Sequence, residues 1–217
     1  EIADQADNIT LAARNYDEAG FLLRIAGNET YQNAYALAAA QHEMLANGFI
    51  ISGNLTSAAT HLYWAAKDFE AADDMTSAIA KYTKYISILK DIMAFDPQSK
   101  GMILVSIGDA QYAMGELEAA EESYAEASDE LVQILSAYLS QSPQSLASFP
   151  SLPKDLVKSY RLSGRLFLAR NTVETLDIPF MYGALTTLAS WAQMYKTAAR
   201  VHNELAESDI SIYDFQS

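Results

Sequence analysis

The stretch IGDAQYAMGELEAAEESYAEA, residues 107–127, decides the fold because of where it places its small residues. It is rich in residues that favour helices, yet larger residues are interrupted by Gly108, Gly115, Ala120 and Ala127. Two helices pack closely only where small side chains let their backbones approach. We therefore expect two antiparallel helices joined by a turn at Gly115. Gly108 and Ala120 should face each other at the crossing, with Tyr124 filling the space beyond them.

Around this stretch, the residue types follow the signature of a known repeat. The matching positions are Leu104, Ile107, Gly108, Gly115, Leu117, Ala120, Tyr124 and Ala127. The segment resembles one tetratricopeptide (TPR) repeat, a pair of antiparallel helices. It departs from the family pattern at three places: Leu104 replaces the usual Trp, Tyr112 lies one place after the expected aromatic, and Val132 replaces the closing Pro.

Similar offsets recur elsewhere in the chain. A second copy comprises Ala46, Gly53, Leu55, Ala58, Leu62 and Ala65. A third comprises Tyr16, Ala19, Leu23 and Ala26. A fourth shows only a first helix, residues 160–169, with Gly164 as the small residue and Phe167 as the aromatic. The resemblance implies an all-α fold, an irregular TPR-like α-solenoid of about nine helices in antiparallel pairs. A plain α-helical bundle is the alternative.

Helical periodicity and stop signals predict where the helices lie. The expected ranges are 2–13, 17–26, 31–51, 57–71, 75–94, 102–114, 117–139 and 154–176, with a ninth helix that begins near Pro179. The helix at 75–94 is expected to be an extra element between repeat pairs. The predicted organisation is TPR-like repeats over 1–139, a Ser/Pro-rich connector over 140–153, a long helix pair over 154–207 and a tail over 208–217.

Composition excludes several classes of partner. The chain has 217 residues, of which 50% are hydrophobic, and its net charge of −14 includes no cluster of Lys or Arg. Such a surface repels nucleic acid and anionic lipid, since it lacks the cations that bind phosphates. No apolar run reaches the roughly 18 to 20 residues of a membrane span. The absence of cysteine excludes disulfides and thiolate sites.

The sequence contains no catalytic signature. Zinc-binding HExxH, the GxSxG elbow, glycine-rich phosphate loops and EF-hand loops are all absent. We therefore predict no enzymatic activity, no cofactor and no metal site. The three histidines are His42, His61 and His202. His42 and His61 could meet across a helix pair, but three unrelated packing or surface histidines are the favoured interpretation.

The resemblance also implies a binding face, because TPR-like proteins bind partners through the concave face lined by their first helices. The matching positions are Asn47, Ile50, Ile51, Met102, Val105, Asp109 and Tyr112. None is Lys or Arg, so a clamp for a peptide's terminal carboxylate is not expected, and an apolar contact is favoured. The alternative is that neighbouring helices of the same chain cover this stripe.

Three N-x-T sequons, at Asn8, Asn28 and Asn54, exceed the one expected by chance and suggest N-linked glycans. The first residue, Glu1, is expected to mark a processed or trimmed form. These two features favour an extracellular or cell-surface protein, with a cytoplasmic location as the alternative.

The sequence as a whole predicts a non-catalytic protein–protein interaction module. A self-assembling structural subunit of a filament, tube or surface layer is the first hypothesis. A soluble TPR-type adaptor that recruits a partner protein through its concave face is the second. A ligand-binding or catalytic helical domain is the third, for which no site is evident.

Overall fold

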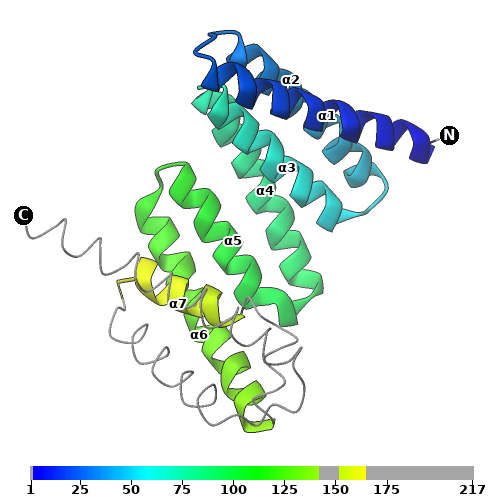
Figure 1. The fold of residues 1–217 in the computed structure, drawn as a ribbon. Helices are drawn as coiled ribbons and strands as arrows, with labels where there is room; N and C mark the ends of the chain where they lie inside the picture. Colours follow the sequence, from blue (N-terminus) through cyan, green and yellow to red (C-terminus); the bar gives the residue numbers. More distant parts are fainter. Residues whose placement is uncertain (1, 142–151, 165–217) are drawn as a thin grey trace, which may run out of the picture. The chain divides into compact units, whose positions relative to one another are not determined.

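The computed structural model describes residues 2–141 and 152–164, and these residues are helical apart from short turns (Figure 1). The elements are α1 (Ile2–Ile25), α2 (Tyr31–Ile51), α3 (Leu55–Ala71), α4 (Met75–Phe95), the 3-10 turn η1 (Pro97–Ser99), α5 (Lys100–Ala113), α6 (Leu117–Gln141) and α7 (Leu152–Leu162). The described part contains no strand. These described residues are thus all-α, and they have the predicted TPR-like architecture of antiparallel helix pairs.

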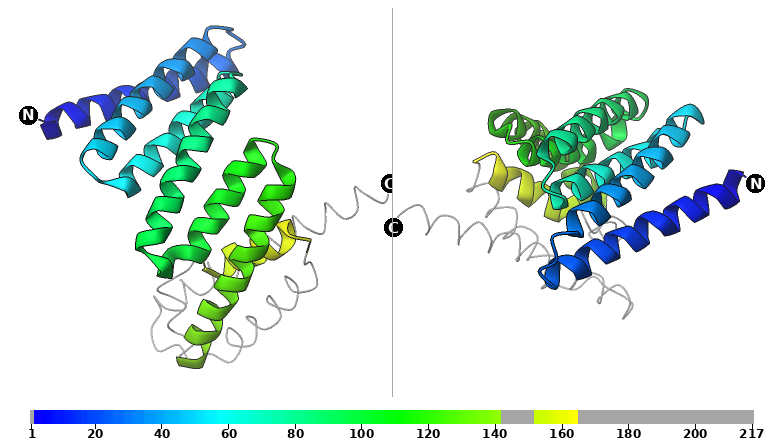
Figure 2. Two further views of the ribbon diagram at one scale, coloured as in Figure 1. Left: turned by 180° about the vertical axis from the view of Figure 1, so that it is seen from behind. Right: turned by 90° about the horizontal axis from the view of Figure 1, so that it is seen from above.

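By its internal packing the chain divides into two units, residues 1–97 with 113–115, and residues 98–112 with 116–217. In the first unit α1, α2, α3 and α4 lie in chain order, each packed antiparallel on the next (Figure 2). The interfaces are lined by alanines that are almost completely buried: Ala38, Ala39, Ala46, Ala58, Ala65, Ala66 and Ala78. These small side chains allow the helices to approach closely. Leu62 and Tyr82 are the large, fully buried residues of this unit.

Three of the turns between helices share one design. Each contains one residue in the left-handed conformation, with φ of 77° at Gly53, 61° at Asp73 and 81° at Gly115. A small residue lies seven places before it, another five places after it, and a large buried residue nine places after it. These sets are Ala46, Ala58 and Leu62; Ala66, Ala78 and Tyr82; and Gly108, Ala120 and Tyr124.

The α3–α4 pair therefore repeats the same packing, and the prediction that residues 75–94 form an extra element is wrong. The two helices pack directly on one another. Asp73 takes the place of the turn glycine, because Asp is one of the few residues besides glycine that tolerates positive φ. The next residue, Asp74, caps α4 by accepting a hydrogen bond from Ser77 N at 3.1 Å. Asn54 caps α3 in the same way, with Ser57 N as the donor at 3.1 Å.

The second unit contains α5, α6 and α7. Gly108 of α5 lies against the ring of Tyr124, and Gly101 lies against Leu131, so glycine permits the close approach of α5 to α6 at both places. Helix α7 packs on α6. It contributes the buried side chains Leu152, Leu156 and Tyr160.

The predicted break between helices 2–13 and 17–26 is wrong, because α1 runs without interruption from Ile2 to Ile25. The intervening residues 14–16 are Arg, Asn and Tyr, none of which prevents helix formation. The third repeat pair is therefore absent. Instead, α1 packs on α2 with Gly20 against the ring of Tyr35, where an added Cβ would lie 3.0 Å from ring carbons.

Two further boundaries differ from the predicted ones. The helix predicted over 154–176 is α7, which ends at Leu162, because Gly164 adopts a left-handed φ of 71° that a helix cannot continue. Gly164 is exposed, and a Cβ added to it would meet no atom of the described residues within 4 Å, so its role there is the turn and not the predicted close packing. The connector predicted over 140–153 is shorter, since α6 extends to Gln141 and α7 begins at Leu152. The predicted ninth helix and tail lie outside the described residues.

Candidate functional site

Three of the residues predicted for a binding face lie on α2, in the first unit. Asn47 is exposed, and its Oδ1 accepts a hydrogen bond from Lys84 Nζ of α4 at 2.9 Å. Ile50 is half-buried, whereas Ile51 is 88% exposed. Of these three residues, Ile51 offers the most open apolar surface.

The other four predicted residues lie on α5, in the second unit. Val105 is buried and Met102 is half-buried. Tyr112 is 58% exposed. The seven predicted residues thus fall into two groups, one in each unit.

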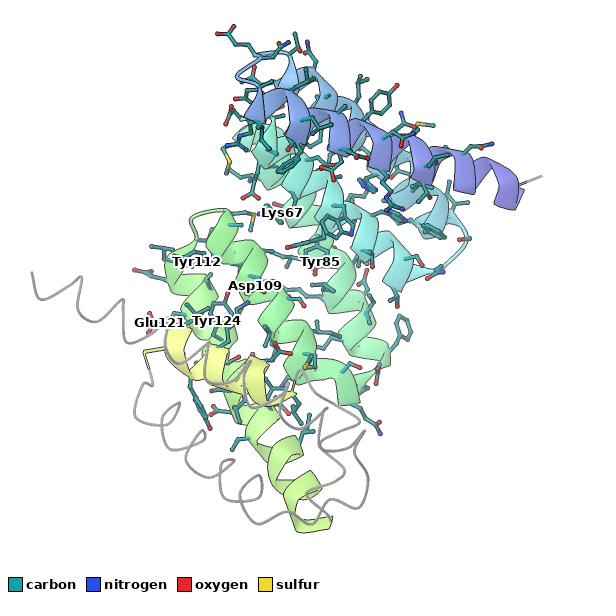
Figure 3. All side chains as sticks on the ribbon, in the orientation of Figure 1. Lys67, Tyr85, Asp109, Tyr112, Glu121 and Tyr124 are labelled. Atoms are coloured by element: carbon teal, nitrogen blue, oxygen red, sulfur yellow. The ribbon has the colours of Figure 1, made fainter. Side chains whose placement is uncertain are left out.

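Asp109, the fourth of the α5 residues, joins three helices. Tyr124 Oη of α6 donates a hydrogen bond to Asp109 Oδ1 at 2.5 Å, and the two side chains lie next to each other in Figure 3. Lys158 Nζ of α7 lies 2.6 Å from Oδ1 and 2.7 Å from Oδ2 of the same carboxylate. Helix α7 therefore contacts part of the predicted stripe, as the alternative interpretation allowed, and Asp109 fixes helices rather than standing free for a partner.

A broader exposed surface follows α2, and we call it the α2 outer face. It consists of seven exposed residues at helical spacing: Asn33, Leu37, Ala40, Met44, Asn47, Gly48 and Ile51. Its large apolar members recur every seven residues, with Leu37 46% exposed, Met44 55% exposed and Ile51 88% exposed. Only Asn47 and Ile51 of this face were predicted, because the family's binding positions, and not the seven-residue spacing, guided the prediction.

The α2 outer face carries no charge. Because His42 is neutral at neutral pH, the only charged residue of α2 is Glu43, and its Oε1 lies 2.5 Å from Lys81 Nζ of α4. Lys84 of the same helix reaches Asn47. In a chain with a net charge of −14, α2 carries a single acidic residue, and α4 holds three lysines and one aspartate.

A second polar feature lies inside the first unit, between α2 and α3. His42 and His61 meet there, with their Nδ1 atoms 3.0 Å apart and their rings stacked at 5.2 Å between centroids. The ring of Phe49 also stacks on His61, with the ring centroids 5.4 Å apart. The interpretation of these two histidines as unrelated is therefore wrong, and the alternative that they meet across a helix pair is confirmed. His202 lies outside the described residues.

Asp68 of α3 completes this cluster. It is 5% exposed, and its Oδ2 has no hydrogen-bond partner and lies 4.0 Å from His42 Nε2. Burial, together with the negative charge of Asp17, raises the pKa of Asp68 to about 7. Burial and the neighbouring His61 lower the pKa of His42 to about 4, and burial also lowers the pKa of His61. At neutral pH both imidazoles are neutral, so one Nδ1–H donates to the other Nδ1.

No sequence signal indicated that Asp68 would be buried, because the segment KDFEA reads as the polar end of an amphipathic helix.

Within residues 2–141 and 152–164, no group of three or more His, Asp or Glu side chains is arranged to hold a metal ion. None of the helices described combines the length and the apolarity needed to cross a membrane.

All three sequon asparagines are exposed. Asn8 lies on α1. Asn28 lies in the turn before α2, where its Oδ1 accepts hydrogen bonds from Thr30 N at 3.0 Å and Thr30 Oγ1 at 2.9 Å. Asn54 uses its Oδ1 as the cap of α3. In both turns the side-chain carbonyl, not the amide nitrogen that a glycan would occupy, makes the bond.

Comparisons with known proteins give one kind of resemblance. No protein-family model matches the chain, and no curated protein sequence matches it. Among solved structures, the chain is similar to a crystal structure of nearly identical TPR-like repeats from a Podosopora anserina kinesin light chain. The similarity covers 92% of this chain and 95% of that one, at 13% identity and a TM-score of 0.42.

Proposed function

We propose that this chain is a non-catalytic protein–protein interaction module whose first partner is another copy of itself. Arrays of helix pairs are typical of proteins that bind other proteins through extended surfaces. The observation that carries the proposal is the α2 outer face, where exposed Leu37, Met44 and Ile51 follow one helix and none of the residues that form the face is itself charged.

The charge of the molecule explains why this face matters for self-association. Two copies with a net charge of −14 repel each other wherever acidic surfaces approach. An uncharged apolar face is where this repulsion is smallest and where contact removes apolar surface from water. A second copy therefore meets less electrostatic repulsion at this face than at the acidic parts of the surface.

Sedimentation velocity over a concentration series tests the proposal. We expect the mean sedimentation coefficient to rise with protein concentration. It should rise more steeply in 0.5 M than in about 0.05 M salt, because salt screens the repulsion between copies. A chain that stays monomeric throughout would overturn self-association. The soluble adaptor, which recruits a different protein through predicted concave-face residues such as Met102 and Tyr112 of α5, would then be the better hypothesis.

The form of the assembly is a separate question. A filament, tube or surface layer needs an interface that does not close on itself, whereas a two-fold interface stops at the dimer. Electron microscopy of the concentrated protein distinguishes them. Rods, tubes or sheets would support the structural subunit, and discrete small particles would limit assembly to closed dimers.

We also propose that the chain is exported and carries N-linked glycans. The support is the exposure of Asn8, Asn28 and Asn54, each the first residue of an N-x-T sequon. Intact mass spectrometry of the protein from its natural source should show additions of hexose and N-acetylhexosamine. Peptide mapping after glycosidase treatment should place them at these asparagines. A bare polypeptide mass would remove this proposal without affecting the one on self-association.

A further inference from the structure

We infer that α2 pairs antiparallel with the α2 of a second copy, with Met44 on the two-fold axis. The inference rests on the proposed self-association and specifies its geometry. Its basis is the order of residues along the helix, which is self-complementary about Met44.

The symmetry of the row can be counted along the chain. Leu37 and Ile51 lie seven residues before and after Met44, and both are large and apolar. Four residues away on either side are the small residues Ala40 and Gly48, and three residues away are the amides Gln41 and Asn47. Reversing the direction of the helix thus exchanges each residue for one of the same kind. In a two-fold interface the same patch serves both subunits, so this row of residues would meet its own reverse, with large apolar residues level with large apolar ones.

In an antiparallel pair, residues at equal distances on opposite sides of the axis reach the same level. Leu37 of one copy therefore meets Ile51 of the other. At the inner level, ideal helix geometry places Gln41 opposite the partner's Gly48, and Asn47 opposite the partner's Ala40. Each amide side chain thus lies over a small residue. This arrangement lets the two backbones approach closely while the flexible Met44 side chains fill the centre.

The electrostatics of the site permit this pairing. Glu43, which would lie beside the axis in both copies, is already bound to Lys81 of its own chain. The seven-residue spacing of Leu37, Met44 and Ile51 matches the period of helices that pack at a small left-handed crossing angle. A single helix face buries less than the roughly 800 Å² per partner of a standard interface, so we expect a weak dimer.

Cysteine cross-linking tests the geometry directly, because the natural chain contains no cysteine. Met44→Cys should form a disulfide-linked dimer under mild oxidation, since the two thiols meet at the axis. Ile51→Cys alone should not, because its two copies would lie about 20 Å apart, beyond the reach of a disulfide. A mixture of Leu37→Cys and Ile51→Cys chains, one carrying a size tag, should give the mixed dimer.

Ile25→Cys on α1 is the matched control, because Ile25 is 70% exposed and lies outside the α2 outer face. We expect Met44→Cys to cross-link at least about tenfold faster than this control at equal concentration, owing to the effective concentration within the dimer. In sedimentation, Met44→Glu should abolish the concentration dependence, whereas Ile25→Glu should leave it unchanged. Circular dichroism of each variant checks that the helices remain formed.

The outcomes separate this inference from the proposed function. If the natural chain associates but Met44→Cys reacts no faster than Ile25→Cys, another face forms the dimer, and the inference is overturned alone. Efficient self-cross-linking of Ile51→Cys would mean a parallel arrangement and would also overturn it. A natural chain that is monomeric at every concentration overturns both.

Discussion

Gly108 of α5 lies directly against the ring of Tyr124 of α6. A Cβ placed on Gly108 would come within 2.8 Å of Tyr124 Cε1 and 3.0 Å of two other ring carbons. The ring cannot easily move aside, because it is 2% exposed and its hydroxyl donates a hydrogen bond to Asp109 at 2.5 Å. Glycine is therefore required here by the space between two helices, and not by backbone conformation.

Replacing Gly108 with Ala should destabilise the protein by about 1 to 3 kcal/mol, the usual cost of overfilling a packed core. The loss should appear although Ala is the better helix former by about 1 kcal/mol. Gly48→Ala is the matched control, since Gly48 also lies in a helix but has no atom within 4 Å of a built Cβ. That variant should gain about 0.5 to 1 kcal/mol. Urea denaturation at low protein concentration measures both, and equal changes in the two variants would contradict the packing argument.

The turn at Asp73 makes a different prediction, based on backbone conformation. Its φ is 61°, and its Oδ2 accepts hydrogen bonds from Tyr31 Oη at 2.5 Å and Gln32 Nε2 at 3.1 Å. Asp73→Ala keeps the unfavourable φ and loses both bonds, whereas Asp73→Gly loses the bonds but removes the strain. We expect the Gly variant to be more stable than the Ala variant by about 1 kcal/mol. Thermal unfolding of the two variants under the same conditions measures this difference. An Ala variant as stable as the Gly variant would contradict the argument that the positive φ at position 73 costs stability.

The helix pairs themselves were predictable from the sequence. The small residues around Gly53 and Gly115 predicted two helical hairpins, and both form with the expected turns. The α3–α4 hairpin uses the same offsets, but it escaped prediction because Asp73 stands where glycine was expected. Aspartate is common in solvated loops as well as in left-handed turns, so its identity alone does not distinguish the two.

The binding positions and the buried cluster were harder to predict for physical reasons. Whether Asp109 is open to a partner depends on Lys158, which lies 49 residues away and reaches it from α7. The burial of Asp68 depends on the packing of α1, α2 and α3 together, and local periodicity carries no information on that. The spacing of Leu37, Met44 and Ile51 was present in the sequence, but only the structure shows that no described neighbouring helix covers it.

Asp68 should make stability depend on pH near neutrality. Its pKa is raised from 3.8 to about 7 in the fold, so the folded protein favours the protonated acid. The contribution of this proton to the free energy of unfolding is complete below the pKa that Asp68 has in the unfolded chain, and it is lost as the pH rises towards 7. Asp68→Asn keeps a neutral side chain of the same shape. Relative to the natural chain, it should gain stability between pH 4 and 7, by up to about 4 kcal/mol.

Urea unfolding of the natural chain and the Asp68→Asn variant at several pH values measures this difference. Asp91→Asn, on the exposed side of α4, is the matched control for the loss of one carboxylate. A constant difference between the natural chain and Asp68→Asn across the range would mean that Asp68 is ionised in the fold at all these pH values.

The histidine pair should act in the opposite direction. The pKa of His42 falls from 6.5 to about 4, so the folded protein favours the neutral ring. Its contribution is fully present above pH 6.5 and is lost as the pH falls towards 4, because the unfolded chain then binds a proton that the fold excludes. His42→Asn places an amide where Nδ1 meets His61 and removes the titration. The variant should therefore lose less stability on acidification, by up to about 3 kcal/mol.

This comparison is cleanest in the Asp68→Asn background, because Asp68 Oδ2 lies 4.0 Å from His42 Nε2 and both groups change stability over an overlapping range of pH. Tyr35, Asp17 and His61 also surround the cluster and remain in both chains. Unfolding free energies of Asp68→Asn and of the double variant should converge as the pH falls from 6.5 to 4, or cross if the amide costs little at neutral pH. If the two plots of unfolding free energy against pH stay parallel, His42 accepts a proton in the folded state as readily as in the unfolded chain. The stacked histidine pair would then make no contribution to the loss of stability in acid.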